Sequence, residues 1–563
     1  MELKLYNRLC ERLLGDFARA AVSRDPQYQR LVEAYGPPEQ TGVSQDAARK
    51  IRSWVDWYNR LQASDFKLRY YQILALYFAE HVLACQRSGT DFTDQKALVY
   101  WMATGSGKTL LMHVNILQYI EHIGGPQGFD ELQIIVTTPG VNLIEQHEKE
   151  LGAFISALNR QCGSRIRLTM ATTAALLNRE PGFFDLPQRH GRYRLVLVDE
   201  GHIGLSGGGK EVGAFKKLRY DLLAPENSFL FEYSATYHGI AEKHVQEYQQ
   251  QIVYDYNYYR FFKDGYGKDF AIQSIKDDRF ADPGREEYEN FMAAFSCLAD
   301  KIEDHREMAG AGAAGRNPAL LPGRPLLAFM GNTVVDPKDE GKGDEVSDIR
   351  KLLRFLAGLE EQEKQRLHPV FNGRVQGRLR LTRRPGVSDM VWLSWGEGGY
   401  WGLINVGNGE KFVADCEGHE QLTDSRGNML VELCRDSIIN EQYAFDRIDT
   451  PGSPVNVLIG SRKFAEGWNC FRVSVISLIN LGASRGNKII QIFGRGVRLH
   501  GQNNDGKRRY IEHIQDYEAL ARQTDFAARL RRLETLNVFS LKKSYLERFL
   551  QGLEKDLPVP LEY

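Results

Sequence analysis

The stretch MATGSGKT (102–109) places two glycines and a Gly-Lys-Thr triplet between two apolar segments. The preceding KALVYWMA (96–103) is typical of a buried strand, and the following LLMHVNILQYI (110–120) has the apolar spacing of a helix. A strand, a Gly-rich turn and a helix in this order form the context of a phosphate-binding loop. The strict pattern fails at its first glycine, where Met102 stands. A Gly-Lys-Thr in a surface turn is the alternative, which the flanking elements disfavour.

The residues of this loop predict a site for ATP and Mg²⁺. Glycines let backbone N–H groups curl around phosphate oxygens at a helix N-terminus, where unpaired donors and the helix dipole favour anions. Lys108 would reach the β and γ phosphates, and the Thr109 hydroxyl would bind Mg²⁺. The predicted nucleotide-binding residues of the loop are Thr104, Gly105, Ser106, Gly107, Lys108 and Thr109.

A second apolar segment, LVLVDEGH (195–202), ends in two carboxylates. In parallel α/β sheets, the ends of such strands lie at the same edge as the phosphate-binding loop. Asp199 would therefore hold Mg²⁺, largely through water. Glu200 would orient or deprotonate the attacking water. Taken alone, an Asp-Glu pair at a strand end is an exposed cap about as often as it is a functional site.

The wider chain alternates buried strands with amphipathic helices, which predicts an α/β fold. Between the strands PLLAFMGNT (325–333) and PVNVLIGS (454–461), a segment alternates apolar and polar residues around Gly-rich turns, as a small antiparallel sheet does. We expect a helical N-terminal extension (1–65), a first lobe that binds ATP (66–255), a connecting region and linker (256–323), a second lobe (324–510) with a β-rich insertion at about 370–440, and a helical C-terminal tail (511–563).

Composition limits the class of protein. The 563 residues carry 72 Lys and Arg against 73 Asp and Glu, so a strongly basic, tail-driven nucleic-acid binder is disfavoured. The seven cysteines include no CxxC pair, which favours reduced thiols over a disulfide framework or a zinc module. The N-terminus lacks the pattern of a signal peptide, and no apolar run reaches the length of a membrane span. We expect a cytoplasmic protein that has no membrane partner.

Eight short motifs in a fixed order resemble those of superfamily 2 helicases and translocases of the DExH type. Within that group the chain is most similar to the helicase-like Res subunits of type III restriction enzymes and related phage-defence helicases. The motifs are LRYYQ (68–72), MATGSGKT, TTPGVNLIEQ (137–146), MATTAALL (170–177), VDEGH (198–202), SAT (234–236), EGWN (466–469) and QIFGRGVRL (491–499). The resemblance implies two tandem RecA-like parallel-sheet lobes.

The resemblance also implies roles for individual residues. Gln72 would read adenine, and Glu466 would lie at the interface of the lobes and contribute to the nucleotide site. Gln491, Arg495 and Arg498 would complete the ATP site from the second lobe, with Arg498 as the first choice for an arginine finger. The implied catalytic set is Glu200, Arg498, Arg495, Gln491 and Lys108. Further implied residues are Ser234 and Thr236 for coupling, and Pro139, Gln146 and Thr173 for nucleic-acid contact.

These features predict a nucleic-acid-dependent ATPase that acts on DNA in a restriction or anti-phage setting. An RNA helicase, and an ATP-gated scaffold that controls a partner nuclease without moving, remain alternatives. About 60 residues follow Leu499 and show no Pro-Asp plus Glu-x-Lys arrangement of a nuclease, so any cleavage is expected to belong to another polypeptide or to a region that this chain lacks. Arg508, Arg509 and the cluster Arg529, Arg531 and Arg532 either face phosphates or form solvated faces. Aromatic residues in a small sheet more often form its core than a surface that stacks on bases, and this applies to Trp392, Trp395 and Trp401 of the insertion.

Overall fold

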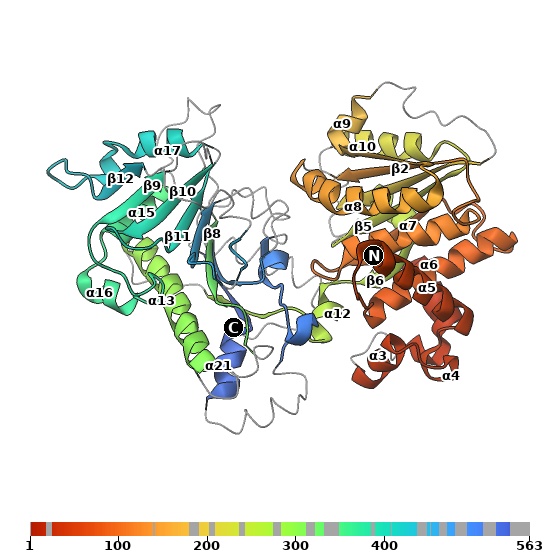
Figure 1. Ribbon diagram of the computed structural model, residues 1–563, viewed down its shortest axis with the longest axis horizontal. Coiled ribbons are helices and arrows are strands. Elements are labelled where there is room, and N and C mark those ends of the chain that lie inside the picture. The colour runs from red at the N-terminus through yellow and green to blue at the C-terminus, as the bar shows by residue number, and fades with distance from the viewer. Residues whose placement is uncertain are drawn as a thin grey trace. The chain divides into compact units, whose positions relative to one another are not determined.

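The computed structural model divides the chain into two compact units, Met1–Asp264 and Gly265–Tyr563. Each unit contains one sheet with helices packed on it (Figure 1). The structure describes residues 2–18, 25–138, 141–179, 191–201, 209–235, 242–273, 283–310, 321–330, 348–383, 389–406, 408–435, 447–450, 452–460, 470–478, 492–509 and 525–540.

The first unit is built on a six-stranded sheet in the order β3-β2-β4-β5-β1-β6. All of its neighbouring strands run parallel. The strands are β1 (Ala97–Met102), β2 (Glu131–Thr138), β3 (Ile166–Thr172), β4 (Arg192–Asp199), β5 (Ser228–Ser234) and β6 (Ile252–Tyr256). Every residue of β1 and β5 is buried, as expected for strands covered on both faces.

Helices connect consecutive strands along the chain. Helices α7 and α8 cover one face of the sheet, and α9 and α10 cover the other (Figure 1). The helices are α6 (Tyr70–Ser88), α7 (Lys108–His122), α8 (Val141–Cys162), α9 (Thr173–Leu177), α10 (Gly209–Leu223), α11 (Glu242–Gln249) and α12 (Tyr258–Lys263). Because all six strands run parallel, their carboxyl ends lie at one edge of the sheet.

The N-terminal extension is helical, as predicted, and it packs on the sheet and helices of the first unit, to which it belongs. Its helices include α1 (Lys4–Leu9), α3 (Pro26–Glu33), α4 (Pro38–Thr41) and α5 (Gln45–Gln62). Helix α5 contacts α6, α7 and α8, and α1 contacts β6. The buried side chains of α5 form one stripe, Ala47, Ile51, Trp54 and Val55, at helical spacing. This agrees with a packing cap.

The second unit contains a nine-stranded sheet in the order β12-β9-β10-β11-β13-β8-β14-β15-β7. Only β10 runs antiparallel to its neighbours among these described strands. The strands are β7 (Asp269–Gln273), β8 (Leu326–Met330), β9 (Leu379–Arg383), β10 (Met390–Trp395), β11 (Gly402–Asn405), β12 (Val431–Arg435), β13 (Val457–Gly460), β14 (Val473–Leu478) and β15 (Thr535–Ser540). Long helix α13 (Pro283–Gly310) packs across β8, β14 and β15.

The expected β-rich insertion extends this sheet and does not form a small sheet of its own. Strand β11 pairs in parallel with β13, which joins the insertion to the central strands. Trp395 and Trp401 are buried in the same hydrophobic core as Phe329 of β8. The tryptophans are therefore core residues, and the stacking-surface interpretation of them is wrong. Helices α15 (Asp348–Ala357), α16 (Glu361–Arg366) and α17 (Gly409–Cys416) accompany these strands.

Two other expected boundaries are corrected. The predicted helical tail contains helix α21 (Phe526–Leu533), but Thr535–Ser540 is a strand that pairs with β14 and β7. The connecting region predicted at 256–323 belongs largely to the second unit, because it holds β7 and α13. The linker residues 311–320 lie outside the described ranges.

The basic cluster at 508–509 is buried, so neither interpretation of it is correct. Arg509 is 3% exposed and donates through Nη1 to Oε1 of Glu534 at 2.5 Å, and its backbone N donates to Oε2 at 2.7 Å. Burial raises the pKa of Glu534, and Arg509 opposes that effect. In the second cluster, Arg529 and Arg532 pair with Asp304 of α13. These arginines hold the second unit together.

We predict that Arg509→Met lowers the free energy of unfolding of the second unit by about 3–5 kcal/mol, because it leaves a buried carboxylate without its cation. Chemical denaturation followed by hydrogen exchange in β15 measures the change. Arg306→Ala, which removes an exposed pair with Glu303, serves as the control and should cost less than about 1 kcal/mol. Equal losses in the two variants would contradict a structural role for the buried pair.

Candidate nucleotide-binding site

The turn between β1 and α7 has a backbone that requires glycine at two positions. Gly105 and Gly107 have φ angles of 87° and 81°, in the left-handed region that favours glycine. Gly107 is also the N-cap of α7. A Cβ atom at Gly107 would lie 2.5 Å from Nε2 of Gln72. This turn therefore presents its backbone at the start of α7, as a phosphate-binding loop does.

The carbonyl of Ser106 is held by two side chains from the start of α6. Tyr71 donates its hydroxyl to this oxygen at 3.1 Å, and Gln72 donates Nε2 at 3.0 Å. Gln72 Oε1 accepts a hydrogen bond from the backbone N of Arg69 at 2.9 Å. The Tyr71 ring stacks on Tyr256 at the end of β6, with centroids 4.0 Å apart. These contacts fix the loop relative to the sheet.

The side chains of the loop fit a bound triphosphate. Lys108 is half-buried, and its Nζ donates to the carbonyl oxygens of Met102 and Ala103 at 3.3 and 3.4 Å. Ser106 Oγ is buried and has no hydrogen-bond partner within the described part of the chain. Thr104 and Thr109 are half-buried. A cation, a hydroxyl group and the backbone N–H groups at the start of a helix form the kind of donor set that phosphate binds.

Asp199, at the end of β4, accepts a hydrogen bond from a histidine. His147 Nε2 lies 3.1 Å from Asp199 Oδ2, and both side chains are buried. Burial alone would raise the pKa of Asp199, but the hydrogen bond and charge of His147 and the charge of Lys108 lower it. Burial disfavours the charged form of His147, whereas its hydrogen bond to Asp199 raises the pKa. Asp199 is therefore held as a carboxylate, the form that a hard cation such as Mg²⁺ requires.

Glu200 begins the turn after β4 in a strained backbone conformation. Its φ angle is 55°, which is uncommon for a residue with a side chain. Its backbone N donates to Tyr233 O at 2.9 Å and lies 3.1 Å from Asp199 Oδ1. A Cβ atom on Gly201, the next residue, would meet the carboxylate of Glu232. The turn that presents Glu200 is therefore fixed on both sides, as strained functional turns often are.

The sheet brings several predicted residues to one edge. β5 lies between β4 and β1, so the ends of these three strands carry Asp199, Ser234 and the phosphate-binding loop side by side. Thr173 lies at the start of α9, where its Oγ1 contacts Thr137 Oγ1 at 3.3 Å. The structure thus gathers Gln72, Thr104, Gly105, Ser106, Gly107, Lys108, Thr109, Asp199 and Glu200 within the first unit.

Arg495 and Arg498 belong to the second unit, in which residues 492–496 are helical. Both side chains are half-buried, and Arg498 follows the end of this helix. The remaining predicted residues fall outside the described part of the structure: Pro139, the Gln146 side chain, Thr236, Glu466 and Gln491.

Two residues of the site, His147 and Tyr71, have contacts that the sequence does not predict. His147 lies in the second turn of helix α8, and no motif singles it out beside the predicted Gln146. Its one signal is that α8 follows β2, the neighbour of β4, so its first turns lie near the carboxyl end of β4. Tyr71 belongs to the LRYYQ motif, but its contact with Ser106 depends on packing between distant segments.

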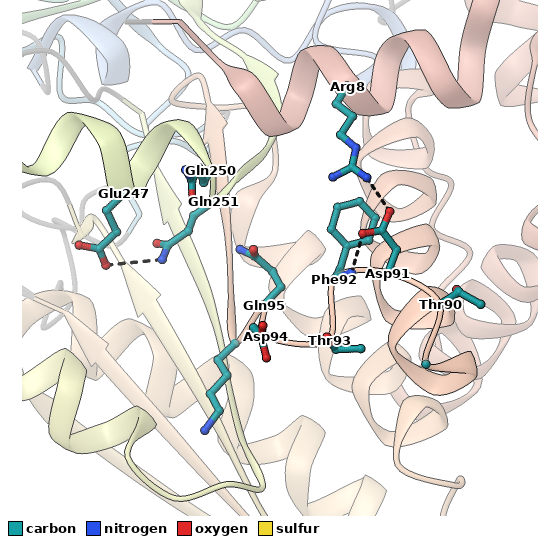
Figure 2. Close-up of a pocket in the computed structure, with 12 residues that line it drawn as sticks. Arg8, Thr90, Asp91, Phe92, Thr93, Asp94, Gln95, Glu247, Gln250 and Gln251 are labelled. Atoms are coloured by element: carbon teal, nitrogen blue, oxygen red, sulfur yellow. Dashed lines mark hydrogen bonds and ion pairs between the residues drawn. The ribbon is translucent and has the colours of Figure 1, made fainter.

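A separate polar pocket lies at the opposite edge of the first sheet. It has a volume of about 640 Å³, and Figure 2 shows Arg8 and Asp91 on one side and Glu247 and Gln251 on the other. Its lining includes Lys96 and Gln251, which directly precede β1 and β6. It therefore lies at the amino ends of these strands and is distinct from the phosphate-binding loop.

None of the described helices is long and apolar enough to span a membrane. A comparison with curated proteins found no match.

Solved structures that resemble this chain are helicases and restriction enzymes at low sequence identity. The Mycobacterium smegmatis helicase Lhr bound to ssDNA and AMP-PNP has 12% identity and a TM-score of 0.38, over 89% of this chain and 50% of Lhr. The ATP-dependent type ISP restriction-modification enzyme LlaBIII bound to DNA has 11% identity and a TM-score of 0.40, over 87% and 32%. The DEAD-box helicase Mss116 bound to ssRNA and UDP-BeF has 11% identity and a TM-score of 0.41, over 86% and 73%. The chain thus spans about half the length of Lhr and about a third of LlaBIII.

A family model described as "Type III restriction enzyme, res subunit" matches residues 65–238. The match begins just before α6 and includes β1 to β5, with the phosphate-binding loop, Asp199 and Glu200. Over residues 65–238 the sequence is therefore similar to the type III restriction enzyme res subunit, which confirms over this range the resemblance inferred from its motifs.

Proposed function

We propose that this protein is a nucleic-acid-dependent ATPase of the helicase or translocase type that acts on DNA. The observation that carries the proposal is the edge of the first sheet at which Lys108 and Asp199 meet. There the glycine-dependent loop opens α7, and the charge of Lys108 lowers the pKa of a buried carboxylate on a neighbouring strand end. A loop for phosphates beside a carboxylate for Mg²⁺ is the arrangement of P-loop ATPases.

Within this site each residue has a proposed role. Lys108 and the backbone of 104–109 bind the phosphates, and Thr109 and Asp199 hold Mg²⁺, which neutralises charge on the phosphates when bound. Glu200 orients the attacking water and accepts its proton. Gln72 contributes to the nucleotide site by holding Ser106, in addition to its implied contact with adenine.

Arg498, and after it Arg495, are proposed to act on the same phosphates from the second unit. A guanidinium group stays charged and binds phosphate oxygens in pairs, so it stabilises charge that develops on the transferred phosphoryl group. Hydrolysis would then require the second unit to close on the first, and reopening would shift the grip of the two units on a nucleic acid. Gln491 and Glu466 complete this set by resemblance.

The biological setting rests on the family match alone. We propose restriction or anti-phage defence in the cytoplasm, with cleavage by a partner nuclease. RNA as the substrate, or a scaffold that hydrolyses ATP without moving, are the alternatives. A DNA triplex separates translocation from the scaffold, because a moving enzyme displaces the third strand in an ATP-dependent manner and a scaffold does not.

We predict that Glu200→Gln lowers the rate of ATP hydrolysis by about 10²- to 10⁴-fold, because the amide cannot accept the proton of the attacking water. Binding of a fluorescent ATP analogue should stay close to that of the wild type. Lys108→Ala is the comparison, since it should lose both binding and hydrolysis. Turnover that persists in the Glu200 variant would remove this residue as the catalytic base.

Arg498→Ala is expected to lower the rate of hydrolysis by about 10³- to 10⁵-fold if this residue is the arginine finger. Nucleotide affinity should change little, because Arg498 acts on charge that develops during the reaction. Steady-state turnover and equilibrium binding of the analogue measure the two effects. Arg531→Ala, on α21, provides an arginine control in the same unit. Equal turnover in Arg498→Ala and the control would mean that Arg498 has no part in the reaction.

His147→Ala removes the hydrogen bond that orients Asp199. Loss of such a partner typically costs about 10- to 100-fold in metal affinity or activity. We therefore predict a higher Mg²⁺ concentration for half-maximal hydrolysis, measured by Mg²⁺ titration at saturating ATP. His122→Ala, at the far end of α7, is the control. The role of His147 is refuted if its variant and the control require the same Mg²⁺ concentration.

A further inference from the structure

Lys268 is a buried lysine at the point where the chain enters the second unit. It follows the unit boundary at Gly265 by three residues and directly precedes β7. Lys268 is only 2% exposed. Burial lowers the pKa of Lys268 to about 7, with Lys301 adding to this effect while Cys470, Asp449 and Glu534 oppose it. An ammonium group in such a place needs acceptors that offset its lost hydration.

The acceptors are backbone carbonyls from two separate segments. Nζ of Lys268 donates to Gly496 O at 3.2 Å, to Arg498 O at 2.6 Å and to Phe471 O at 2.7 Å. A lysine has three side-chain donors, so this set uses all of them. The backbone N of Lys268 donates to Val497 O at 2.6 Å. One residue therefore binds three consecutive carbonyls, 496 to 498, where helix 492–496 ends.

Carbonyls at a helix end lack intrahelical partners and carry partial negative charge, which makes a cation favourable there. The carbonyls in question belong to the turn that contains Arg498 and follows Arg495. Lys268 thus fixes the backbone from which the two proposed arginines project.

The third acceptor connects this turn to the segment after the EGWN motif. Phe471 and Arg472 donate their backbone N–H groups to Asp449 Oδ1 at 2.9 and 3.2 Å. The Phe471 ring stacks on His500, with centroids 3.8 Å apart. Lys268 and this stack therefore hold residues 470–472 and 496–500 against each other.

The chain before Lys268 is also fastened to the segment that follows the arginine turn. Arg508 is 2% exposed, and its Nη1 donates to Tyr266 O at 3.1 Å and to Gly267 O at 2.9 Å. The backbone N of Arg508 donates to Gly265 O at 2.8 Å, and Gly267 N donates to Gly506 O at 2.9 Å. The four residues from Gly265 to Lys268 are thus bound along segment 496–508.

We propose that Lys268 is a positioning residue for Arg495 and Arg498. Its hydrogen bonds link the chain segment that connects the two units to the turn that carries these arginines. This inference rests on the proposed function, because it assigns Lys268 a role through the arginines of that site. A displacement of the connection at Gly265 is transmitted to the arginine turn through the contacts of Lys268 and Arg508. The orientation of the arginines then follows the movement of the units during each cycle.

The test compares Lys268→Met with Lys301→Met in nucleic-acid-stimulated ATP hydrolysis. Lys301 is a matched control, because it is buried in the same unit and donates Nζ to the carbonyls of Arg532 in α21 and of Thr535 at the start of β15. Misplacing a reacting group by about 1 Å can cost about 100-fold in rate. We expect Lys268→Met to lower kcat by about 10- to 100-fold at unchanged KM for ATP, and Lys301→Met to change neither.

A double variant tests whether Lys268 acts through the arginine. In the Arg498→Ala background, Lys268→Met should cause a smaller further loss of kcat than in the wild type, because only Arg495 remains to be positioned, whereas an unrelated structural defect would multiply in full. Thermal unfolding of each variant shows whether the fold is retained. If Lys268→Met does not fold, Lys268→Gln, which keeps two N–H donors, takes its place with the same expected result.

Three results would overturn the inference. Equal kcat for the Lys268 and Lys301 variants, a raised KM without a loss of kcat, or independent losses in the double variant each remove the positioning role. A wild-type protein that hydrolyses no ATP with any DNA or RNA instead refutes the proposed function itself, so the two failures are distinguishable.

Discussion

The carbonyl oxygen of Ser106 is the fixed point on which the proposed chemistry of the first unit depends. Two donors from α6, the Tyr71 hydroxyl and the Gln72 amide, bind it, and Gln72 leaves no space for a side chain at Gly107. The loop is therefore shaped before any ligand binds. A preorganised loop loses little conformational freedom on binding, which favours affinity and precise placement of the reacting phosphate.

The two units handle charge at their proposed functional ends in a similar way. In the first unit, His147 and Lys108 lower the pKa of the buried Asp199, which favours the carboxylate form that binds a cation. In the second unit, Lys268 binds the carbonyls around Arg498. Each proposed reacting group is thus oriented by a buried polar partner from a different segment of the chain. Such partners are costly to bury. Their hydrogen bonds restrict the group that they bind to a single orientation.

Much of the fold could be predicted because local patterns determine it. The strand-turn-helix around Lys108 and the buried strand that ends at Asp199 follow from apolar runs and glycine positions within a few residues. The strand at Thr535–Ser540 was mistaken for helix because Leu533, Leu536 and Phe539 have a spacing of three. Pairing with β14 and β7 determines its conformation, and these partners are distant in sequence. The insertion was expected to form its own sheet for the same reason. Its β11 pairs with β13, which lies more than fifty residues away in the sequence.

The features that could not be predicted, in the site and elsewhere, are long-range polar contacts. No pattern indicates that His147 reaches Asp199, or that Arg509 is paired with Glu534 inside the protein.

The proposed function is tested most directly by the steady-state rate of ATP hydrolysis of the wild-type protein with and without single- and double-stranded DNA and RNA. We predict a low rate with Mg²⁺ and ATP alone and a marked increase on adding DNA. A rate that stays at background with every nucleic acid would contradict the account.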